Sequence, residues 1–240
     1  MSNRFYQIFA CMLSLVLCVS CRDDDKPSVT IETGTLTDID NNIYKTVKIG
    51  SKWWMAENLK VKRFKNGQLI PNLDLTNDWV NTTQPALCSY DNTINNTGIL
   101  YNYYAVSDTQ GLAPAGWHVA TEDEWKELET YIGIPATELE KVNWRGTTEG
   151  DLLKIEGPAG WTKHENIWGI NKYGFTALAG GCRLFNGYWS APGLFGMGFW
   201  WSSTETNGQA WYRYLDYKKS GIFRYYGQKN YGMNVRCVKD

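Results

Sequence analysis

Histidine is scarce in this chain of 240 residues, which contains only His118 and His164. Two isolated histidines do not make a metal site or a Cys/His nucleophile pair, because both need several ligands or partners held close together. Cysteine is also sparse: of six residues, only Cys21, Cys88, Cys182 and Cys237 follow the N-terminal apolar run, and no two of these four have C-x-x-C spacing. Neither a redox motif nor a zinc knuckle is therefore indicated.

The chain also lacks an excess of charge of either sign. Its 24 lysines and arginines nearly balance 25 aspartates and glutamates, for a net charge of −1. No basic patch of the kind that neutralises phosphates is visible, so nucleic acid is not expected as a partner. No paired carboxylates, Ser/His/Asp order or phosphate-cradling glycine loop stands out. We therefore expect a protein that is not an enzyme and that carries no cofactor.

Long apolar runs are missing except at the N-terminus, where one extends from Ile8 to Val19. This run is too short to span a bilayer, which takes about 20 apolar residues, and it predicts a signal peptide over residues 1–20. Ser20 directly before Cys21 resembles a bacterial lipobox, which implies cleavage before Cys21 and acylation of that cysteine. An ordinary secretory signal is the alternative.

The residues after Cys21 read RDDDKPS, and a polar segment without apolar periodicity continues to residue 36. This acidic run is similar to the export tag of Bacteroidetes surface lipoproteins. The alternative interpretation is that it is only a solvated spacer between the anchor and the domain. We expect residues 21–36 to be the acylated cysteine and its tether. The protein is then an outer-membrane lipoprotein, exposed at the cell surface and bound to the membrane only through its lipid anchor.

Strand-like patterns begin at residue 37. In IYKTVKI, alternation predicts a strand with Ile43, Lys45, Val47 and Ile49 on its inner face. The preceding DIDNN resembles a calcium loop only briefly, because Ile43 stands where the loop needs glycine. We interpret DIDNN as a hairpin turn made by Asp and Asn. Calcium binding has only weak support, since QPA at 84–86 lacks the acidic or amide residue of calcium-dependent lectins.

The stretch GWHVATEDEWKEL gathers a histidine, two tryptophans and four carboxylates at 116–128. Thr121 and Glu124 have the spacing of a capping box, and acids in a first helical turn favour the helix dipole. We therefore interpret this cluster as a helix start rather than an acid/base site, with the helix ending at Gly133. Its apolar stripe is predicted to comprise Trp125, Leu128, Tyr131 and Ile132.

Further elements follow on both sides of that helix. ILYNYYAVS at 99–107 predicts a strand passing into a helix, and a short helix is expected around Glu149–Ile155. From residue 157 the pattern is mainly β, with a hairpin turn in DYKKSGIF that closes on Gly221. Strands at both ends with helices between them predict an α+β domain over 37–240 whose terminal strands share one sheet.

Several of these segments occur in the order found in one known family: GILYNYYAV, LAPAGWHVATEDEWKEL, NKYGFTALAGGCR, FWWSSTE and NVRCVKD. Over residues 37–240 the chain resembles the Fibrobacter succinogenes major paralogous domain, for which no general activity is established. The resemblance implies a fold similar to C-type lectins and the formylglycine-generating enzyme. Such a fold has short, mainly antiparallel twisted sheets, two or three short helices and long irregular loops.

The resemblance also bears on the cysteines. Ala113 stands where family members commonly have a cysteine, so the disulfide that would join that cysteine to Cys237 is not available. The resemblance therefore leaves Cys182 as a replacement partner for Cys237, with Cys88 as the free thiol.

The functional hypothesis from the sequence is a non-enzymatic binding or adhesion module for glycan or polysaccharide. Its motivation is the lectin-like resemblance, the anchor and a high aromatic content of 12 tryptophans and 15 tyrosines. Most such rings are usually core, and a surface protein partner is the main alternative. A formylglycine-generating-type oxidase is a further alternative that would need Cys182 and Cys237 as a reactive pair. The candidate sugar-stacking rings are Trp200, Trp201, Tyr212, Tyr214, Tyr225 and Tyr226.

Overall fold

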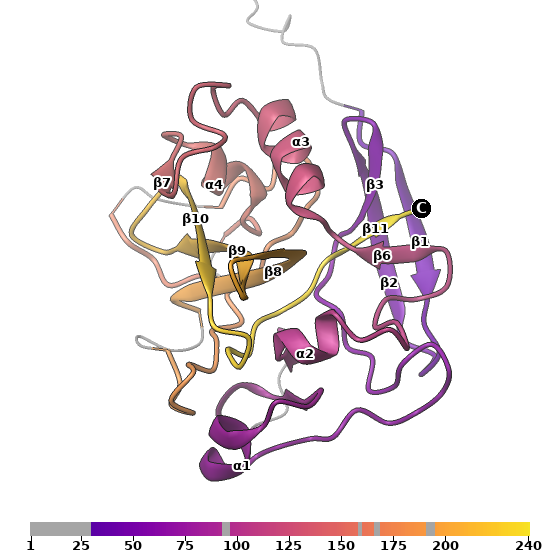
Figure 1. Cartoon of the computed structure of the whole chain (residues 1–240). Coiled ribbons are helices and arrows are strands. Elements are labelled where there is room, and N and C mark those ends of the chain that lie inside the picture. The colour runs from indigo at the N-terminus through magenta and orange to yellow at the C-terminus, as the bar shows by residue number, and fades with distance from the viewer. Residues whose placement is uncertain (1–29, 93–96, 158–159, 166–168, 191–194) are drawn as a thin grey trace, which may run out of the picture.

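The computed structural model describes residues 30–92, 97–157, 160–165, 169–190 and 195–240 (Figure 1). The expected signal peptide, Cys21 and most of the tether lie outside the described residues. The described part is a mixed α+β structure built mainly of antiparallel strands, as the sequence predicts. No helix within it is long and apolar enough to cross a membrane.

The first sheet has five strands in the order β1-β2-β3-β11-β6. Its members are β1 (Thr33–Thr37), β2 (Ile43–Ile49), β3 (Lys52–Met55), β6 (Trp117–Val119) and β11 (Cys237–Lys239). The last strand, β11, lies between β3 and β6, with Val238 paired to Trp54 and Cys237 to Val119. The prediction that the two ends of the chain share one sheet is confirmed (Figure 1).

The second sheet has four strands in the order β7-β10-β9-β8, and a short pair forms a third. The second sheet contains β7 (Asn143–Arg145), β8 (Met197–Thr206), β9 (Gln209–Asp216) and β10 (Ile222–Gly227). The short pair is β4 (Leu87–Cys88) with β5 (Leu100–Tyr101). The helices are α1 (Thr76–Asn81), α2 (Tyr103–Val106), α3 (Glu122–Ile132) and α4 (Glu149–Leu153), with one 3₁₀ turn, η1 (Tyr90–Asn92).

The turn between β1 and β2 is the predicted hairpin of Asp and Asn. One Asp38 carboxylate oxygen accepts from the backbone amides of Asp40 and Asn42, each at 2.9 Å, and the other accepts from the Tyr44 hydroxyl at 2.5 Å. Asp40 in turn accepts from the backbone amide of Lys62 at 2.6 Å. These carboxylates are therefore engaged with protein groups that hold the turn.

The predicted inner face of β2 is wrong at two positions, Ile43 and Lys45, which are both exposed. Ile43 is 68% exposed, whereas Tyr44 is fully buried and the buried positions continue with Thr46, Val47 and Ile49. The reason is that the first sheet has core on both faces, so simple alternation fails. Tyr44 belongs to one buried cluster, and Val47 and Ile49 belong to the other.

The start of α3 is the capping box that the sequence predicts. The Thr121 hydroxyl accepts from the Glu124 amide at 3.2 Å, and the Glu124 carboxylate accepts from the Thr121 amide at 3.0 Å. Gly133 ends the helix at φ 117°, a left-handed conformation that glycine adopts without strain. One member of the predicted apolar stripe is wrong, because Tyr131 is 51% exposed, with its ring against that of Tyr173.

A buried network of arginines and glutamates fastens α3 to one face of the second sheet. Glu129 accepts from Arg145 of β7 at 2.6 Å and from Arg213 of β9 at 2.6 Å. Glu122 accepts from Arg213 at 2.7 Å and from Arg224 of β10 at 2.6 Å. Because each of these side chains is at most 6% exposed, the ion pairs are shielded from solvent and fix which face of the sheet is covered.

This network predicts a loss of stability in acid. Burial alone would raise the pKa of Glu129, but Arg213 and Arg145 outweigh it and hold the pKa below its ordinary value of 4.5. The pKa of Glu124 is also lowered, since the Thr121 amide and His118 outweigh burial. A lowered folded-state pKa stabilises the fold above the unfolded-state pKa, and this contribution disappears as the pH falls through the folded-state value.

We therefore expect the urea midpoint to hold steady from pH 7 to about 5 and to fall below about pH 4.5. Urea titrations followed by tryptophan fluorescence across this range would measure it. The Glu124→Gln variant keeps a side chain of similar shape without a titrating carboxylate, so its midpoint should fall less steeply. A wild-type midpoint that stays level down to pH 3 would contradict the prediction.

Candidate functional site

Aromatic side chains form a row across the face of the second sheet that α3 does not cover. At β8 and β9 this face meets the larger core cluster, against which Phe199 and Tyr212 pack. Trp144 of β7 pairs with Phe223 of β10, Phe223 pairs with Tyr214 of β9, and Tyr214 pairs with Phe199 of β8. Directly paired residues of neighbouring strands point to the same face, so the four rings are adjacent. Ring centroids lie 5.3 Å apart for Trp144 and Phe223, 5.6 Å for Phe223 and Tyr214, and 4.5 Å for the stacked Tyr214 and Phe199.

A second row lies two positions further along the same strands. Tyr225 of β10 pairs with Tyr212 of β9, and Tyr212 pairs with Trp201 of β8, which is buried in the core. The rings of Tyr225 and Tyr212 adjoin the first row at Phe223 and Phe199. We call the six rings of the two rows the aromatic face: Trp144, Phe199, Tyr212, Tyr214, Phe223 and Tyr225.

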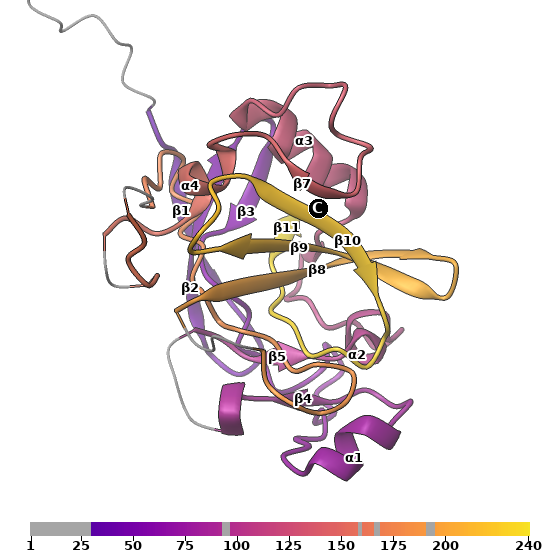
Figure 2. The same ribbon diagram turned by 90° about the vertical axis from the view of Figure 1, so that its left-hand side faces the viewer.

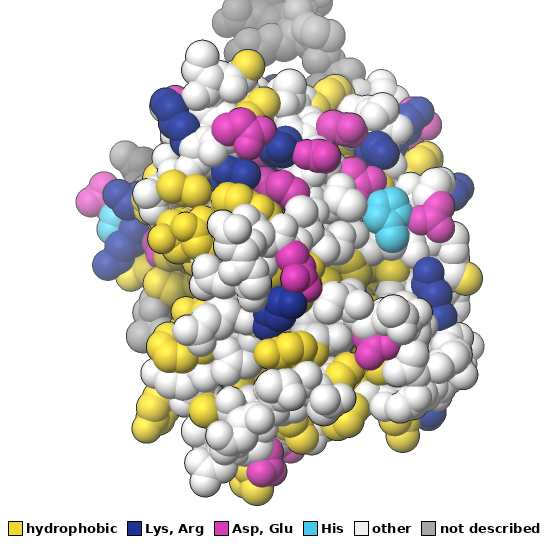
Figure 3. Space-filling model, viewed as in Figure 1, with side chains coloured by type: hydrophobic (Ala, Val, Ile, Leu, Met, Phe, Trp, Pro, Cys, Tyr) yellow, Lys and Arg dark blue, Asp and Glu magenta, His cyan; other side chains and the backbone are white. Residues whose placement is uncertain are grey.

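The aromatic face is the side of the sheet that α3 does not cover. The arginines that bind α3 alternate with the aromatic residues along β9 and β10, and therefore point to the opposite face. Trp144 is 37% exposed, and the other five rings are half-buried. Figure 2 shows β8, β9 and β10 with no helix in front of them, and Figure 3 shows hydrophobic side chains gathered where Figure 1 draws β10.

The polar atoms of the aromatic face are the three tyrosine hydroxyls and the indole nitrogen of Trp144. Burial raises the pKa of both Tyr212 and Tyr214, and for Tyr214 the hydrogen bond to Asp216 adds to it. The Tyr214 hydroxyl donates to the Asp216 carboxylate, which fixes the ring on the sheet. The six ring residues are uncharged themselves, and the Asp216 carboxylate lies beside Tyr214 on the same side of β9.

A family model matches residues 47–239, which is most of the chain and nearly all of its described elements. The chain belongs to the Fibrobacter succinogenes major domain family. The resemblance found in the sequence motifs is thereby confirmed. Neither the comparison with curated proteins nor that with solved structures found a match.

In this Fibrobacter succinogenes major domain, two of the candidate stacking rings are core. Trp200 is 1% exposed and Trp201 is fully buried, so their assignment as sugar-stacking rings is wrong. The Trp200 indole nitrogen donates to Asn58 at 2.8 Å, and that of Trp201 donates to the Tyr101 carbonyl at 2.9 Å. Buried indoles with satisfied N–H groups pack the interior and offer no ring face to a ligand.

The remaining candidates lie together. Tyr212, Tyr214 and Tyr225 belong to the aromatic face, while Tyr226 pairs with Trp211 at the next position and its ring stacks on Tyr225 at the edge of the face. The sequence reasoning missed Trp144, Phe199 and Phe223. Period-two alternation in IFRYY and AWYRYL was a usable signal for Phe223, but not for Trp144, which comes from an isolated three-residue strand.

The predicted disulfide between Cys182 and Cys237 is wrong, because Cys88, Cys182 and Cys237 are all free and buried. Cys182 and Cys237 both pack in the larger core cluster, where each thiol fills space like a small apolar side chain. Burial raises the pKa of Cys88 and Cys182 to about 12 and also raises that of Cys237. Since the thiolate is the reactive form, these residues are placed as core and not as nucleophiles.

His118 lies between two carboxylates at the start of α3. Its Nδ1 is 2.6 Å from Asp240, and its Nε2 is 2.9 Å from both oxygens of Glu124. Glu124 also accepts from Lys52 at 3.3 Å, so its carboxylate is shared between the helix cap, Lys52 and His118. Within the described ranges, no group of three or more His, Cys, Asp or Glu side chains is arranged to hold a metal ion.

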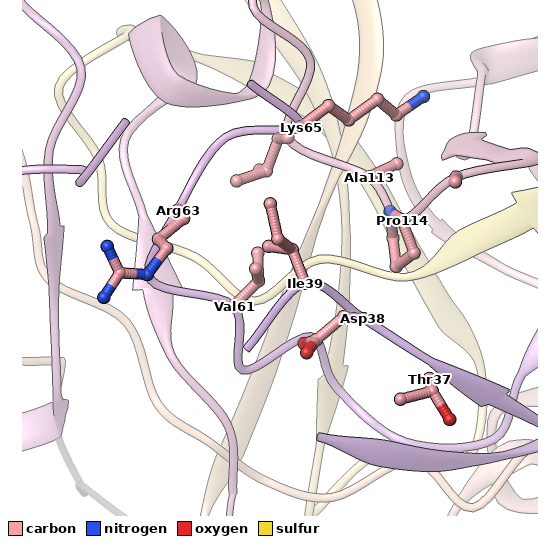
Figure 4. A pocket seen from close by; sticks show the side chains of 10 residues that line it. Thr37, Asp38, Ile39, Val61, Arg63, Lys65, Ala113 and Pro114 are labelled. Carbon is pink, nitrogen blue, oxygen red and sulfur yellow. The ribbon is translucent and has the colours of Figure 1, made fainter. Parts of the chain in front are cut away.

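A hollow of about 330 Å³ lies beside the β1–β2 turn (Figure 4). Ile39, Val61 and Pro114 contribute apolar surface to it. Its two cations already have partners, since Lys65 donates to the Trp117 carbonyl at 3.1 Å and Arg63 pairs with Asp40 at 3.0 Å. Figure 4 shows the Arg63 guanidinium directed away from Ile39. This hollow could therefore enclose a small molecule, but neither of its two cations is available to bind one.

Proposed function

We propose that this protein is a non-enzymatic binding module for uncharged glycan chains, with the aromatic face as the binding surface. Pyranose rings present apolar C–H faces that pack on aromatic rings, and such contact removes apolar area from water. The observation that carries the proposal is the row of four rings, one from each strand of the second sheet, on a face that α3 leaves uncovered.

The dimensions of the row suit a chain rather than a single sugar. Three steps between neighbouring strands, each about 4.8 Å, give a row about 14 Å long. The second row of Tyr225 and Tyr212 widens it and adds hydroxyl groups beside the rings. Because none of the six residues is charged, the surface favours a neutral polysaccharide over an acidic one.

We also propose a fold type and a cellular location for the protein. Short antiparallel sheets, a shared sheet for both ends of the chain and long irregular connections support a C-type-lectin-like fold. The lipobox-like sequence before Cys21 supports a lipoprotein of the outer membrane, with the binding face presented at the cell surface. Calcium has no part in the proposal, since the Asp38 and Asp40 carboxylates are already engaged within the turn.

A protein partner is the second candidate, and one observation favours it. The rings continue beyond the sheet, where Tyr231 packs against Phe185 at 5.7 Å. Phe185 is 42% exposed and Tyr188, on the same hairpin, is 67% exposed. Contiguous exposed apolar side chains of this kind often mark protein interaction sites.

The test is binding to a panel of neutral polysaccharides by affinity electrophoresis and calorimetry. Trp144→Ala and Phe223→Ala should each weaken binding roughly 30-fold, because an aromatic anchor contributes about 2 kcal/mol. Trp144 is the more informative position, since its exposure lets the variant fold normally.

Tyr131→Ala is the matched control for these variants. It removes an even more exposed ring from α3, away from the aromatic face, and should leave binding unchanged. Equal loss of binding in the control and in Trp144→Ala, or no binding to any neutral polysaccharide, would count against the proposal. The second outcome together with capture of a surface protein would favour the partner hypothesis.

A further inference from the structure

A polar hollow of about 330 Å³ lies at the far end of the β8–β9 hairpin. The end of α1, the start of α2, the turn between β8 and β9, and the segment after β10 surround it. Uncharged side chains capable of hydrogen bonding dominate its lining: Asn81, Thr83, Tyr104, Gln209, Gln228 and Asn230.

The rim of this hollow is held in place by tight turns. Asn207 and Gly208 have φ of 48° and 78°, and Thr206 pairs with Gln209 across them. Two central residues at positive φ in a two-residue loop make the turn that matches strand twist, so Gln209 sits on a rigid hairpin. On the opposite rim, the Asn230 carbonyl accepts from the Trp79 indole at 2.7 Å, and its side-chain amide donates to the Phe185 carbonyl at 3.0 Å.

The lining offers hydrogen-bonding capacity that the protein does not use. The side chains of Thr83, Tyr104, Gln209 and Gln228 make no hydrogen bond to any residue in the described part of the chain. An apolar ligand would remove these amides and hydroxyls from water without giving them partners, which costs binding energy. A ligand rich in hydroxyl groups would supply both donors and acceptors.

The charge of the hollow is balanced internally. Lys229 is its one lining cation, and its ammonium group lies 2.7 Å from the Glu205 carboxylate and over the Tyr103 ring. The pair leaves no net charge to attract an anion. Size, hydrogen-bonding capacity and neutrality together point to an uncharged polyol of the size of one sugar residue.

We propose that this polar hollow is a second binding site, specific for a single neutral sugar residue and separate from the aromatic face. The geometry of the hollow carries this proposal independently of the rings on the second sheet. The site recognises hydroxyl groups through Gln209, Gln228 and Tyr104, whereas the aromatic face recognises apolar sugar faces.

The test is amide chemical-shift mapping of the isotope-labelled protein, titrated with glucose, galactose, mannose and xylose, with glucuronate as the charged comparison. A ligand of this size is expected to bind with a Kd on the order of 1–10 mM. At least one neutral sugar should shift the amides of residues 207–209 and 228–230, and glucuronate should bind at least tenfold more weakly.

The double variant Gln209→Ala with Gln228→Ala should lose at least tenfold in affinity while keeping its fold, since neither side chain is bonded within the described structure. Gln68→Ala, which removes an exposed glutamine elsewhere, and Trp144→Ala on the aromatic face should both retain the site. Three results would each overturn the proposal. The first is chemical-shift changes confined to the aromatic face, and the second is no change with any sugar at 50 mM, which is about fivefold above the upper end of the expected Kd. The third is equal affinity for glucuronate and the neutral sugars.

Discussion

Replacing Glu129 with alanine is expected to lower the free energy of unfolding by about 3–5 kcal/mol. A domain of this size has a total stability of about 5–15 kcal/mol, so the variant would lose much of it. The expected loss is large because Glu129 is fully buried and binds two buried arginines, Arg145 and Arg213, each at 2.6 Å. Without the carboxylate, two positively charged guanidinium groups remain buried with one fewer negatively charged partner.

The geometry explains why the two arginines depend on Glu129 to different degrees. Arg145 loses its only carboxylate in the described structure and keeps a bond to the Leu139 carbonyl at 3.1 Å. Arg213 keeps Glu122, which it binds through two nitrogens at 2.7 and 3.0 Å. We therefore expect the damage to concentrate where β7 meets α3.

Urea unfolding at pH 7 measures this loss, with Glu127→Ala as the matched control. Glu127 lies on the exposed side of the same helix, so its removal should change stability by less than about 0.5 kcal/mol. Glu129→Gln should fall between the two, because an amide retains hydrogen bonding but not the charge. A loss below about 1 kcal/mol for Glu129→Ala would show that the network stabilises the fold far less than its burial implies.

Local signals in the sequence were sufficient for the parts of the fold that local chemistry builds. Thr121 with Glu124 specified the start of α3, and Asp38 specified the first hairpin, because in both cases the side chain bonds its own neighbouring backbone. Local signals did not indicate the partners of Glu122. These are Arg213, which is 91 residues away in the sequence, and Arg224, which is 102 residues away. An acidic residue in the first turn of a helix is already explained by the helix dipole. Its presence in the sequence therefore does not indicate whether a distant arginine also binds it.

The candidate site was predictable only where strand alternation holds. Tyr212 and Tyr214 alternate with Arg213 on β9, so one face of that strand is aromatic and the other binds α3. On β8 the consecutive Trp200 and Trp201 are both buried, because this strand passes between two cores. Trp200 packs in one cluster and Trp201 in the other, an arrangement that depends on chain segments distant in sequence.

The cysteine pairing failed for a related reason. Spacing alone does not determine connectivity, and a pairing inferred by replacing a missing family cysteine assumed that Cys182 and Cys237 meet. Both thiols lie in one large cluster, yet each is surrounded by apolar side chains and remains free.

Trp201→Ala is expected to destabilise the protein by about 3–5 kcal/mol, the usual range for deleting a buried tryptophan. Trp201 is fully buried, its ring packs against Tyr103 at 5.4 Å, and its indole N–H donates to the Tyr101 carbonyl at 2.9 Å. The substitution leaves a cavity and a carbonyl without that donor. Thermal and urea unfolding would measure the loss.

The exposed Trp144 provides the contrast that separates folding from binding. Trp144→Ala should leave the unfolding midpoint nearly unchanged while weakening polysaccharide binding, because its ring lies on the surface of the aromatic face. In molecules that stay folded, Trp201→Ala should weaken binding less than Trp144→Ala, because Trp201 is buried and only supports the Tyr212 ring beside it at 6.2 Å. If Trp144→Ala instead kept full affinity for the polysaccharide, the exposed end of the aromatic face would not be the binding surface.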